Sequence, residues 1–255
     1  MIVLDSHPFV FKQVKIMVEE LCSNPKYDDT VLILGYNIFP ASGLDSCRKK
    51  YPGKKIAIYN LEQFYDGSPW LNSHSLYWLK NVDEVWDYNK ENLKYLRTKY
   101  GIIAKYHPIK WVSSLKTLHN ECNMTYDVLF YGDLTARRYK VLQKIIRNVK
   151  NVKLLVAYGV TGDALDRLIE KSKIILNVHA FDSYMNQEIV RMFYPLINGK
   201  CILSEHSMND SYAGDAIVYS DIDNMPNKIT ELLKDDKWAK IASNASERFK
   251  QISGK

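Results

Sequence analysis

The chain has 255 residues, of which 46% are hydrophobic and 25% are charged. This length and composition allow one large buried core or two small ones, and they exclude an intrinsically disordered protein. The net charge of +6 favours anionic partners such as nucleotides and phosphates. Because the basic residues form no dense stripe interleaved with aromatic residues, nucleic acid is not the expected partner.

The four cysteines have neither the spacing of metal ligands nor that of a disulfide scaffold. We therefore expect reduced thiols and no metal site built on them. No apolar segment is long enough to span a membrane, and the N-terminus lacks the pattern of a signal peptide. The sequence thus predicts a cytoplasmic protein without a membrane span.

Short apolar runs alternate with helix-period segments along nearly the whole chain. The runs are rich in Val, Ile, Leu and Tyr, which is typical of strands covered on both faces. Strands that alternate with helices predict parallel βαβ units. The predicted strands span residues 2–5, 31–36, 55–60, 84–88, 103–108, 127–132, 153–159, 173–179, 200–204 and 216–220.

A polar segment at 113–126 separates two series of these units. We predict an α/β protein of two Rossmann-like parallel-sheet halves, residues 1–115 and 120–235, followed by a C-terminal helix within 236–255. In open sheets of this kind, ligands bind beyond the carboxyl ends of the strands. The residues that follow each strand are therefore the candidates for a site.

The strand at 127–132 ends at Gly132, which Asp133 follows, and Arg137 and Arg138 open the next helix. A glycine turn, the N–H groups of a helix start and two guanidinium groups together suit a diphosphate. A solvent-facing pair of arginines is the simpler alternative, although cations at a helix start are slightly unfavourable.

The strand at 153–159 also ends in a glycine-bearing turn, at Tyr158 and Gly159. Tyr158 is placed to stack on a base or a sugar. The more usual role of a single strand-end tyrosine is to pack in the core.

The strand at 173–179 ends at His179, and a run of polar residues then precedes a helix. Glu188 and Arg191 lie three residues apart at the start of that helix and so share a face. An exposed ion pair is the simpler alternative. The position beyond a strand end favours a ligand site, in which a carboxylate accepts ribose hydroxyls and Arg191 binds phosphate. The other polar residues of this cluster are Asp182, Tyr184 and Asn186.

Three segments, VLFYGDLTARR, VAYG and ILNVHAFDSYMNQEIVRMFYPLINGKCILSE, resemble the nucleotide-binding half of GT-B glycosyltransferases. The resemblance is to the CgeB-like and family-4-like groups, which carry R-x-F-E-x-x-x-x-G before a strand ending in Ser-Glu. IAIYNLEQFY and LKNVDEVWDYNKENLKYL are similar to the acceptor-side half. The resemblance implies two halves facing each other across a cleft, a nucleoside diphosphate sugar as donor, and arginine or lysine rather than a metal at the leaving diphosphate.

Two departures from the family pattern affect the expected site. Tyr194 stands where many of these enzymes have the glutamate that binds ribose, so Glu188 or Glu205 is the candidate to replace it. The chain is also short for the fold, which implies that both halves are trimmed.

Glycosyl transfer needs positive charge for the departing diphosphate and, in an inverting enzyme, a base for the acceptor hydroxyl. Glu62 follows the strand at 55–60, where a carboxylate faces the ligand side of the sheet, and it is our first candidate for the base. His74 is the second, with Asp5 and His7 as further rivals. For each residue alone, a capping or surface role is the simpler interpretation.

Asp221-Ile-Asp223 matches the D-x-D motif with which metal-dependent GT-A transferases hold a divalent ion. The motif lies near the C-terminus, directly before a helix, where aspartates commonly act as caps. We therefore expect these two residues to cap the helix and expect no metal at the site.

The sequence predicts a metal-independent glycosyltransferase that moves a sugar from a UDP or GDP sugar to a hydroxyl of a glycan or another acceptor. A sugar-nucleotide epimerase and a DNA-base glucosyltransferase are alternatives on the same fold. A non-catalytic nucleotide-binding module is the alternative outside enzymes.

Overall fold

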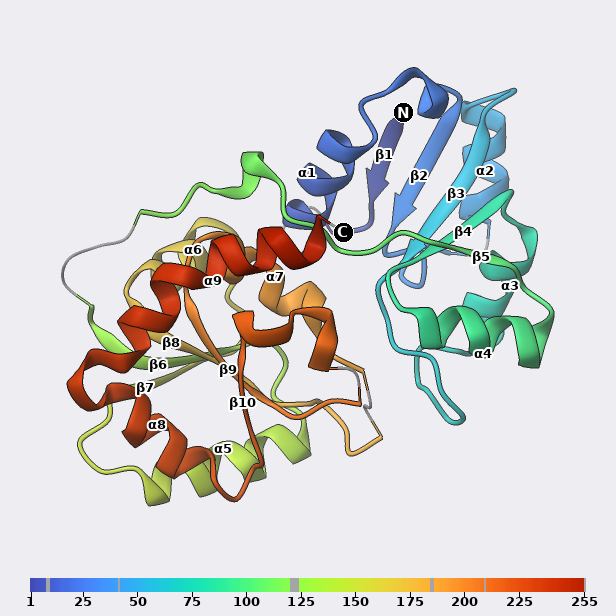
Figure 1. Cartoon of the computed structure of the whole chain (residues 1–255). Helices are drawn as coiled ribbons and strands as arrows, with labels where there is room; N and C mark the ends of the chain where they lie inside the picture. The colour runs from blue at the N-terminus through green and yellow to red at the C-terminus, as the bar shows by residue number, and fades with distance from the viewer. Residues whose placement is uncertain (8–9, 41, 120–123, 184–185, 209, 255) are drawn as a thin grey trace. The chain divides into compact units, whose positions relative to one another are not determined.

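The computed structural model describes residues 1–7, 10–40, 42–119, 124–183, 186–208 and 210–254 (Figure 1). The chain forms two compact units, Met1–Ile109 and Lys110–Lys255. The polar segment that separates the two series of strands thus lies within the second unit, as does the C-terminal helix. No helix in the described ranges is long and apolar enough to cross a membrane.

The first unit is a parallel five-stranded sheet with the strand order β1-β2-β3-β4-β5. Neighbouring strands pair in parallel throughout, as the βαβ pattern predicted. Its elements are β1 (Ile2–Asp5), α1 (Lys12–Leu21), β2 (Thr30–Leu34), α2 (Gly43–Lys50), β3 (Lys55–Asn60), α3 (Ser73–Asn81), β4 (Glu84–Asp87), α4 (Lys90–Tyr100) and β5 (Ala104–Tyr106).

The core of the first unit follows from the two-residue period of its strands. Val31 and Ile33 point to the same face of the sheet and pack with residues of α2, α3 and α4, among them Trp78 and Leu96. Every residue of β2 is buried, which confirms that this interior strand is covered on both faces.

The second unit is also a parallel five-stranded sheet, with the strand order β10-β9-β8-β6-β7. Its strands are β6 (Tyr126–Tyr131), β7 (Leu154–Ala157), β8 (Ser172–Asn177), β9 (Cys201–Glu205) and β10 (Val218–Ser220). Its helices are α5 (Ala136–Asn148), α6 (Gly162–Glu170), α7 (Ile189–Ile197), α8 (Met225–Leu233) and α9 (Lys237–Ser253).

This strand order creates a switch point in the second sheet. From β6 the chain moves outward to β7, and it then crosses back to β8 on the other side of β6. Right-handed connections place α5 and α6 on opposite faces of the sheet as a result. Sheets of this order bind ligands at the switch point, beyond the carboxyl ends of the strands, which here are the ends of β6 and β8.

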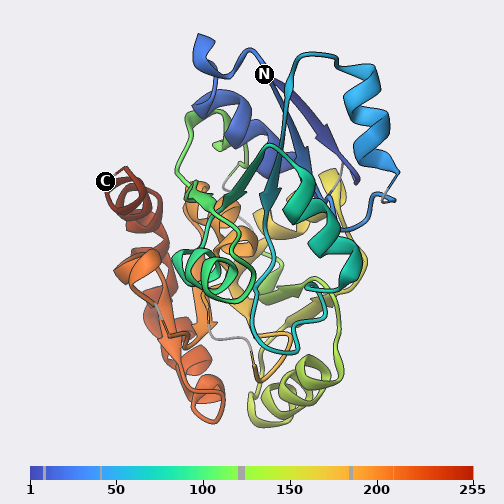
Figure 2. The same ribbon diagram turned by 90° about the vertical axis from the view of Figure 1, so that its right-hand side faces the viewer.

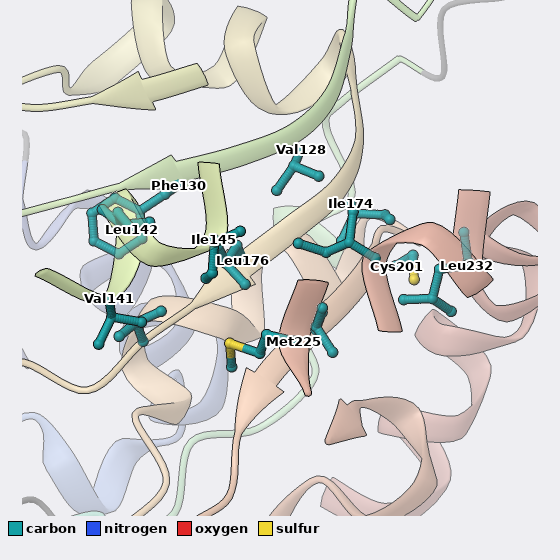
Figure 3. Packing of buried hydrophobic residues seen from close by; sticks show 14 residues of the cluster. Val128, Phe130, Val141, Leu142, Ile145, Ile174, Leu176, Cys201, Met225 and Leu232 are labelled. Carbon is teal, nitrogen blue, oxygen red and sulfur yellow. The ribbon is translucent and has the colours of Figure 1, made fainter. Parts of the chain in front are cut away.

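The buried side chains of α5 and α8 pack on one face of this sheet, together with Ala242 from the start of α9, while α6 and α7 lie on the other (Figure 1). Val128, Phe130 and Ile174 from the strands meet Leu142 and Met225 from the helices in this core (Figure 3). Both helices are thereby fixed against the sheet. The start of α5, which carries two arginines, consequently has a defined position.

The segment that joins the two series of strands is held on the second unit by side-chain hydrogen bonds. The Asn198 side chain accepts from the N–H groups of Thr117 and Leu118, both at 2.9 Å, and donates to the Leu115 carbonyl at 2.9 Å. The Trp111 N–H donates to Ser253 Oγ in α9, which runs beside α8 (Figure 2). These bonds explain why the second unit begins before the predicted boundary.

The predicted strands are present, but several end earlier than the apolar runs do. β2 ends at Leu34 because Gly35 has a φ of +69°, and β8 ends at Asn177, which leaves His179 in the following loop. The predicted capping by Asp221 and Asp223 is wrong. Asn224 holds the N-cap position of α8 without a side-chain cap bond.

Candidate functional site

Predicted site residues from three strand ends and two helix starts meet at the switch point of the second unit. Gly132 follows β6, His179 follows β8 and Glu205 ends β9. Arg137 and Arg138 lie in the first turn of α5, and Glu188 is the N-cap of α7, with Arg191 in its first turn. The hydrogen bonds described below connect these groups into one cluster.

Glu188 is the central carboxylate of the cluster. Its Oε1 accepts from Arg138 Nη2 at 2.8 Å, and its Oε2 lies 3.1 Å from His179 Nδ1. Arg191 Nη2 is more distant, at 3.9 Å from Oε1. Burial raises the pKa of Glu188, but the His179 hydrogen bond and the neighbouring cations outweigh it and lower the pKa to about 2. Glu188 is therefore ionised at neutral pH.

Two acceptors favour the protonated form of the His179 ring. Its Nδ1 faces the Glu188 carboxylate, and its Nε2 lies 3.0 Å from the His206 carbonyl and 3.3 Å from Ser207 Oγ. A ring with a proton on both nitrogens can donate to the carboxylate and to the carbonyl at once. Burial lowers the pKa of His179, but the hydrogen bond and charge of Glu188 outweigh it and leave the pKa raised. The ring adds a buried positive charge to the cluster.

Arg138 is buried, and its guanidinium donates hydrogen bonds to three protein acceptors. Its Nε donates to the Val178 carbonyl at 2.8 Å, its Nη1 to the Asp133 carbonyl at 3.0 Å, and its Nη2 to Glu188. The side chain thus ties the loops after β6 and β8 to the start of α7. This geometry favours a structural role for Arg138 over the predicted contact with phosphate, and Asp133 contributes its carbonyl while its side chain is exposed.

Arg137 reaches the surface beside Arg138 but is paired with carboxylates. Its Nη1 donates to Glu205 Oε2 and to the His179 carbonyl, both at 2.9 Å. Its Nε contacts Asp182, whose side chain is almost fully exposed. Because an exposed carboxylate in water binds only weakly, an incoming anion can replace Asp182 at this guanidinium.

Arg191 is the arginine of the cluster that is least neutralised. Its guanidinium lies on Gly132, and Nη1 donates to the Tyr131 carbonyl. Its Nε is buried and has no hydrogen-bond partner among the residues that the structure describes. An unpaired buried donor costs free energy, so this group is suited to receive an acceptor oxygen.

Gly132 is required for this arrangement. Its φ is +111°, a conformation that disfavours residues with a side chain. A Cβ at this position would lie 1.9 Å from Arg191 Nη1. The glycine of the turn after β6 thus admits the guanidinium directly onto the backbone.

The charges of this cluster predict a loss of stability in acid. A carboxylate with a lowered pKa stabilises the fold above its ordinary value of 4.5, and this contribution is lost as the pH falls toward about 2. We expect the opening free energy of α7, measured by hydrogen exchange, to fall between pH 5 and about 2.5. In Glu188→Gln the opening free energy of α7 should be lower at neutral pH and should no longer fall with acid. An equally steep fall in that variant would contradict the prediction.

The remaining predicted residues of the second unit are less involved. Tyr158 follows β7 and is 65% exposed, and Gly159 beside it has a φ of +69°; a Cβ added there would meet no described atom within 4 Å. Asn186 is buried. Tyr184 lies outside the described residues.

Sequence reasoning gave too little weight to the end of β9. The Glu205 carboxylate accepts from Arg137 and from the His179 N–H, which is 3.0 Å from Oε2. His206 stacks on Tyr219 with ring centroids 5.6 Å apart, and its Nδ1 lies 2.8 Å from Asp210 Oδ2. The strand-end rule that identified His179 also identifies Glu205 and His206 when it is applied to β9.

In the first unit, Glu62 lies in the loop after β3 and His74 in the first turn of α3, and both are half-buried. Asp5 ends β1 and pairs with Lys15 at 3.4 Å. Glu62 and His74, the first two candidates for the base, therefore lie on the side of the sheet where the strands have their carboxyl ends.

The described part of the chain holds no group of three or more His, Cys, Asp or Glu residues placed to bind a metal ion. Asp223 of the D-x-D motif instead pairs with Lys144 of α5.

Comparison with known proteins supports the fold class. The chain is an α/β protein with two five-stranded parallel sheets and a GT-B-like fold. S. aureus TarM superposes with a TM-score of 0.58 at 12% identity over 96% of this chain and 54% of TarM. Anabaena HepE in complex with UDP-glucose superposes with a TM-score of 0.59 at 9% identity, over 96% of this chain and 78% of HepE.

No family model matches the chain. By sequence it is 28% identical over 187 residues to the uncharacterized protein R358 of Acanthamoeba polyphaga mimivirus. The match covers 70% of this chain and 62% of R358, so the chain spans less than two thirds of that relative.

Proposed function

We propose that the chain is a metal-independent glycosyltransferase of the CgeB-like or family-4-like type, with a nucleoside diphosphate sugar as donor. The observation that carries this proposal is the Arg191 guanidinium on Gly132, at the switch point of the second sheet, whose buried Nε has no hydrogen-bond partner among the described residues. An Arg cation with a free donor beside a helix start is suited to a diphosphate oxygen.

In the proposed donor site, Arg191 and Arg137 hold the diphosphate, and the Arg137–Asp182 contact opens to admit it. Glu205 accepts the ribose hydroxyls, since the Tyr194 hydroxyl is 3.1 Å from Thr117 Oγ1 and is thus engaged with the joining segment. Glu188, Arg138 and His179 hold the surrounding loops in place. Tyr158 offers an exposed ring on which the base stacks.

We favour UDP over GDP because solved structures of TarM and of HepE are complexes with UDP. The first unit then serves the acceptor, a hydroxyl of a glycan or a related molecule. The acceptor oxygen bonds to the anomeric carbon of the sugar while the bond from that carbon to the diphosphate breaks. Glu62 takes the proton of the hydroxyl, and the diphosphate leaves with its charge neutralised by the arginines.

The experiment is to measure UDP release from UDP-glucose with and without glycan acceptors. We expect Glu62→Gln to lower the turnover rate by about 10²–10⁴-fold, the usual contribution of a general base, without changing UDP affinity. Glu91→Gln, an exposed glutamate of α4, is the matched control and should retain full turnover.

A non-catalytic nucleotide-binding module is the alternative that the same data test. UDP binding without turnover in the unaltered protein would favour it. Turnover that is equal in Glu62→Gln and in the control would overturn the assignment of the base and leave the donor site standing.

A further inference from the structure

The loop that carries Glu62 is fixed by two buried asparagines. Asn60 Nδ2 donates to the Glu62 carbonyl at 2.8 Å, and the Glu62 N–H donates back to Asn60 Oδ1 at 3.3 Å. Asn92 Nδ2 donates to the same carbonyl at 2.7 Å, and Asn92 Oδ1 accepts from the Phe64 N–H at 2.8 Å. The backbone on both sides of the Glu62 Cα is thus held by side chains from β3 and α4.

Both asparagines are in turn fixed by Asp87, the last residue of β4. Its Oδ2 accepts from Asn60 Nδ2 at 2.7 Å, and its two oxygens lie 3.1 and 3.0 Å from Asn92 Nδ2. The Asn89 N–H donates to Oδ1 at 2.8 Å. Asp87, Asn60 and Asn92 are all fully buried.

This network lowers the stability of the core relative to apolar packing. The donors that contact both oxygens of the Asp87 carboxylate are neutral amides, and burial raises its pKa although these hydrogen bonds favour the ionised form and lower it. An apolar side chain at the end of β4 would avoid that cost. Buried polar networks that cost stability in this way are expected where a functional site must be held in one geometry.

The network also includes a third strand end. Tyr36, just after β2, donates its hydroxyl to Asn60 Oδ1 at 3.3 Å. Burial, followed by the negative charges of Asp87 and Glu62, raises the pKa of Tyr36.

We propose that Asp87 is a positioning residue for the reaction: through Asn60 and Asn92 it fixes the backbone at Glu62, so that the Glu62 carboxylate stands ready to take the acceptor proton. This inference rests on the proposed function for the role of Glu62. Asp87 itself touches neither substrate.

Asp87→Asn tests the inference because it keeps the shape and replaces one acceptor oxygen with a donor. The new amide opposes the amide of Asn60 or of Asn92, which releases the Glu62 carbonyl from one of its bonds. We expect amide exchange at residues 61–66 to rise by about 10-fold or more, which corresponds to about 1.4 kcal/mol of lost protection. Peptides of the second unit should be unchanged.

The kinetic expectation separates positioning from general stability. In UDP-glucose turnover, kcat of Asp87→Asn should fall by about 10–100-fold while KM for the donor stays within about twofold, since the donor site is untouched. Asp45→Asn is the matched control, because it makes the same substitution at an exposed aspartate of α2 outside the network. If Asp87→Asn does not fold, Asn92→Ala removes the same hold on Glu62 and should give the same split.

The outcomes are distinguishable. An unaltered protein that releases no UDP overturns the proposed function. Turnover with equal kcat in the unaltered protein and in Asp87→Asn, or unchanged exchange at 61–66, overturns the positioning role alone.

Discussion

Replacing Glu188 with alanine is expected to lower the stability of the second unit by about 3–5 kcal/mol, the typical cost of removing one partner of a buried ion pair. Glu188 is the carboxylate that Arg138 and His179 share, at 2.8 and 3.1 Å. Both cations are almost fully buried, so neither can recover hydration when the carboxylate is removed. Urea unfolding of the second unit, followed by hydrogen exchange in β6 and β8, measures the change.

Glu231→Ala is the matched control for this prediction. Glu231 pairs with Lys228 at 2.7 Å on the exposed face of α8, where water replaces the lost contact. No measurable change is expected there. A Glu188→Ala variant as stable as the control would show that the cluster is not held by its charges.

The second large effect is expected at Gly132. Alanine there must adopt a φ near +111° and places its Cβ against Arg191, so the guanidinium has to leave the Tyr131 carbonyl. The charge-assisted hydrogen bond to the ligand, worth about 1.5–3 kcal/mol, is then lost. We expect UDP affinity to fall by roughly 10–100-fold in a calorimetric titration.

Gly199→Ala controls for the backbone strain. Gly199 also has a positive φ, of +67°, but its Cβ would meet only the Ala242 carbonyl at 3.4 Å. It should lose stability and keep UDP affinity. Equal affinity in Gly132→Ala and Gly199→Ala would contradict the placement of the diphosphate at Arg191.

The sequence was sufficient to predict the strands and most of the cluster. β2 and β8 are apolar runs because both faces are covered, and the side chains that follow such runs gather at one edge in a parallel sheet. This pattern predicted the site residues Gly132, His179, Glu188 and Arg191. The polar segment between the two series of strands predicted the two parallel-sheet halves, and the structural comparison supports this fold.

The different contacts of Arg137 and Arg138 could not be predicted from the sequence. Arg137 and Arg138 are neighbours in the chain, yet α5 turns the first toward Glu205 and buries the second against Val178. That difference depends on β8 lying beside β6, which only the strand order determines. Local sequence carries no signal for it.

The boundary between the two units could not be predicted from the sequence either. Asn198 holds Thr117 from 81 residues further along the chain, and no periodicity in 113–126 indicates that contact. The Asp87 network likewise joins Tyr36, Asn60 and Asn92 from three separate segments. Long-range polar contacts of this kind become visible only when the strands are placed side by side.

The most direct test of the central claim, that the second unit binds a nucleoside diphosphate through Arg191, is a calorimetric titration with UDP and with GDP, with and without Mg²⁺. We predict that one of the two nucleotides binds equally well with and without the ion. Its affinity should fall by at least about 10-fold in Arg191→Ala, as expected for a lost charge-assisted bond, and remain unchanged in Arg248→Ala, whose exposed guanidinium pairs with Asp215. Binding of neither nucleotide, or equal affinity in the two variants, would contradict the claim.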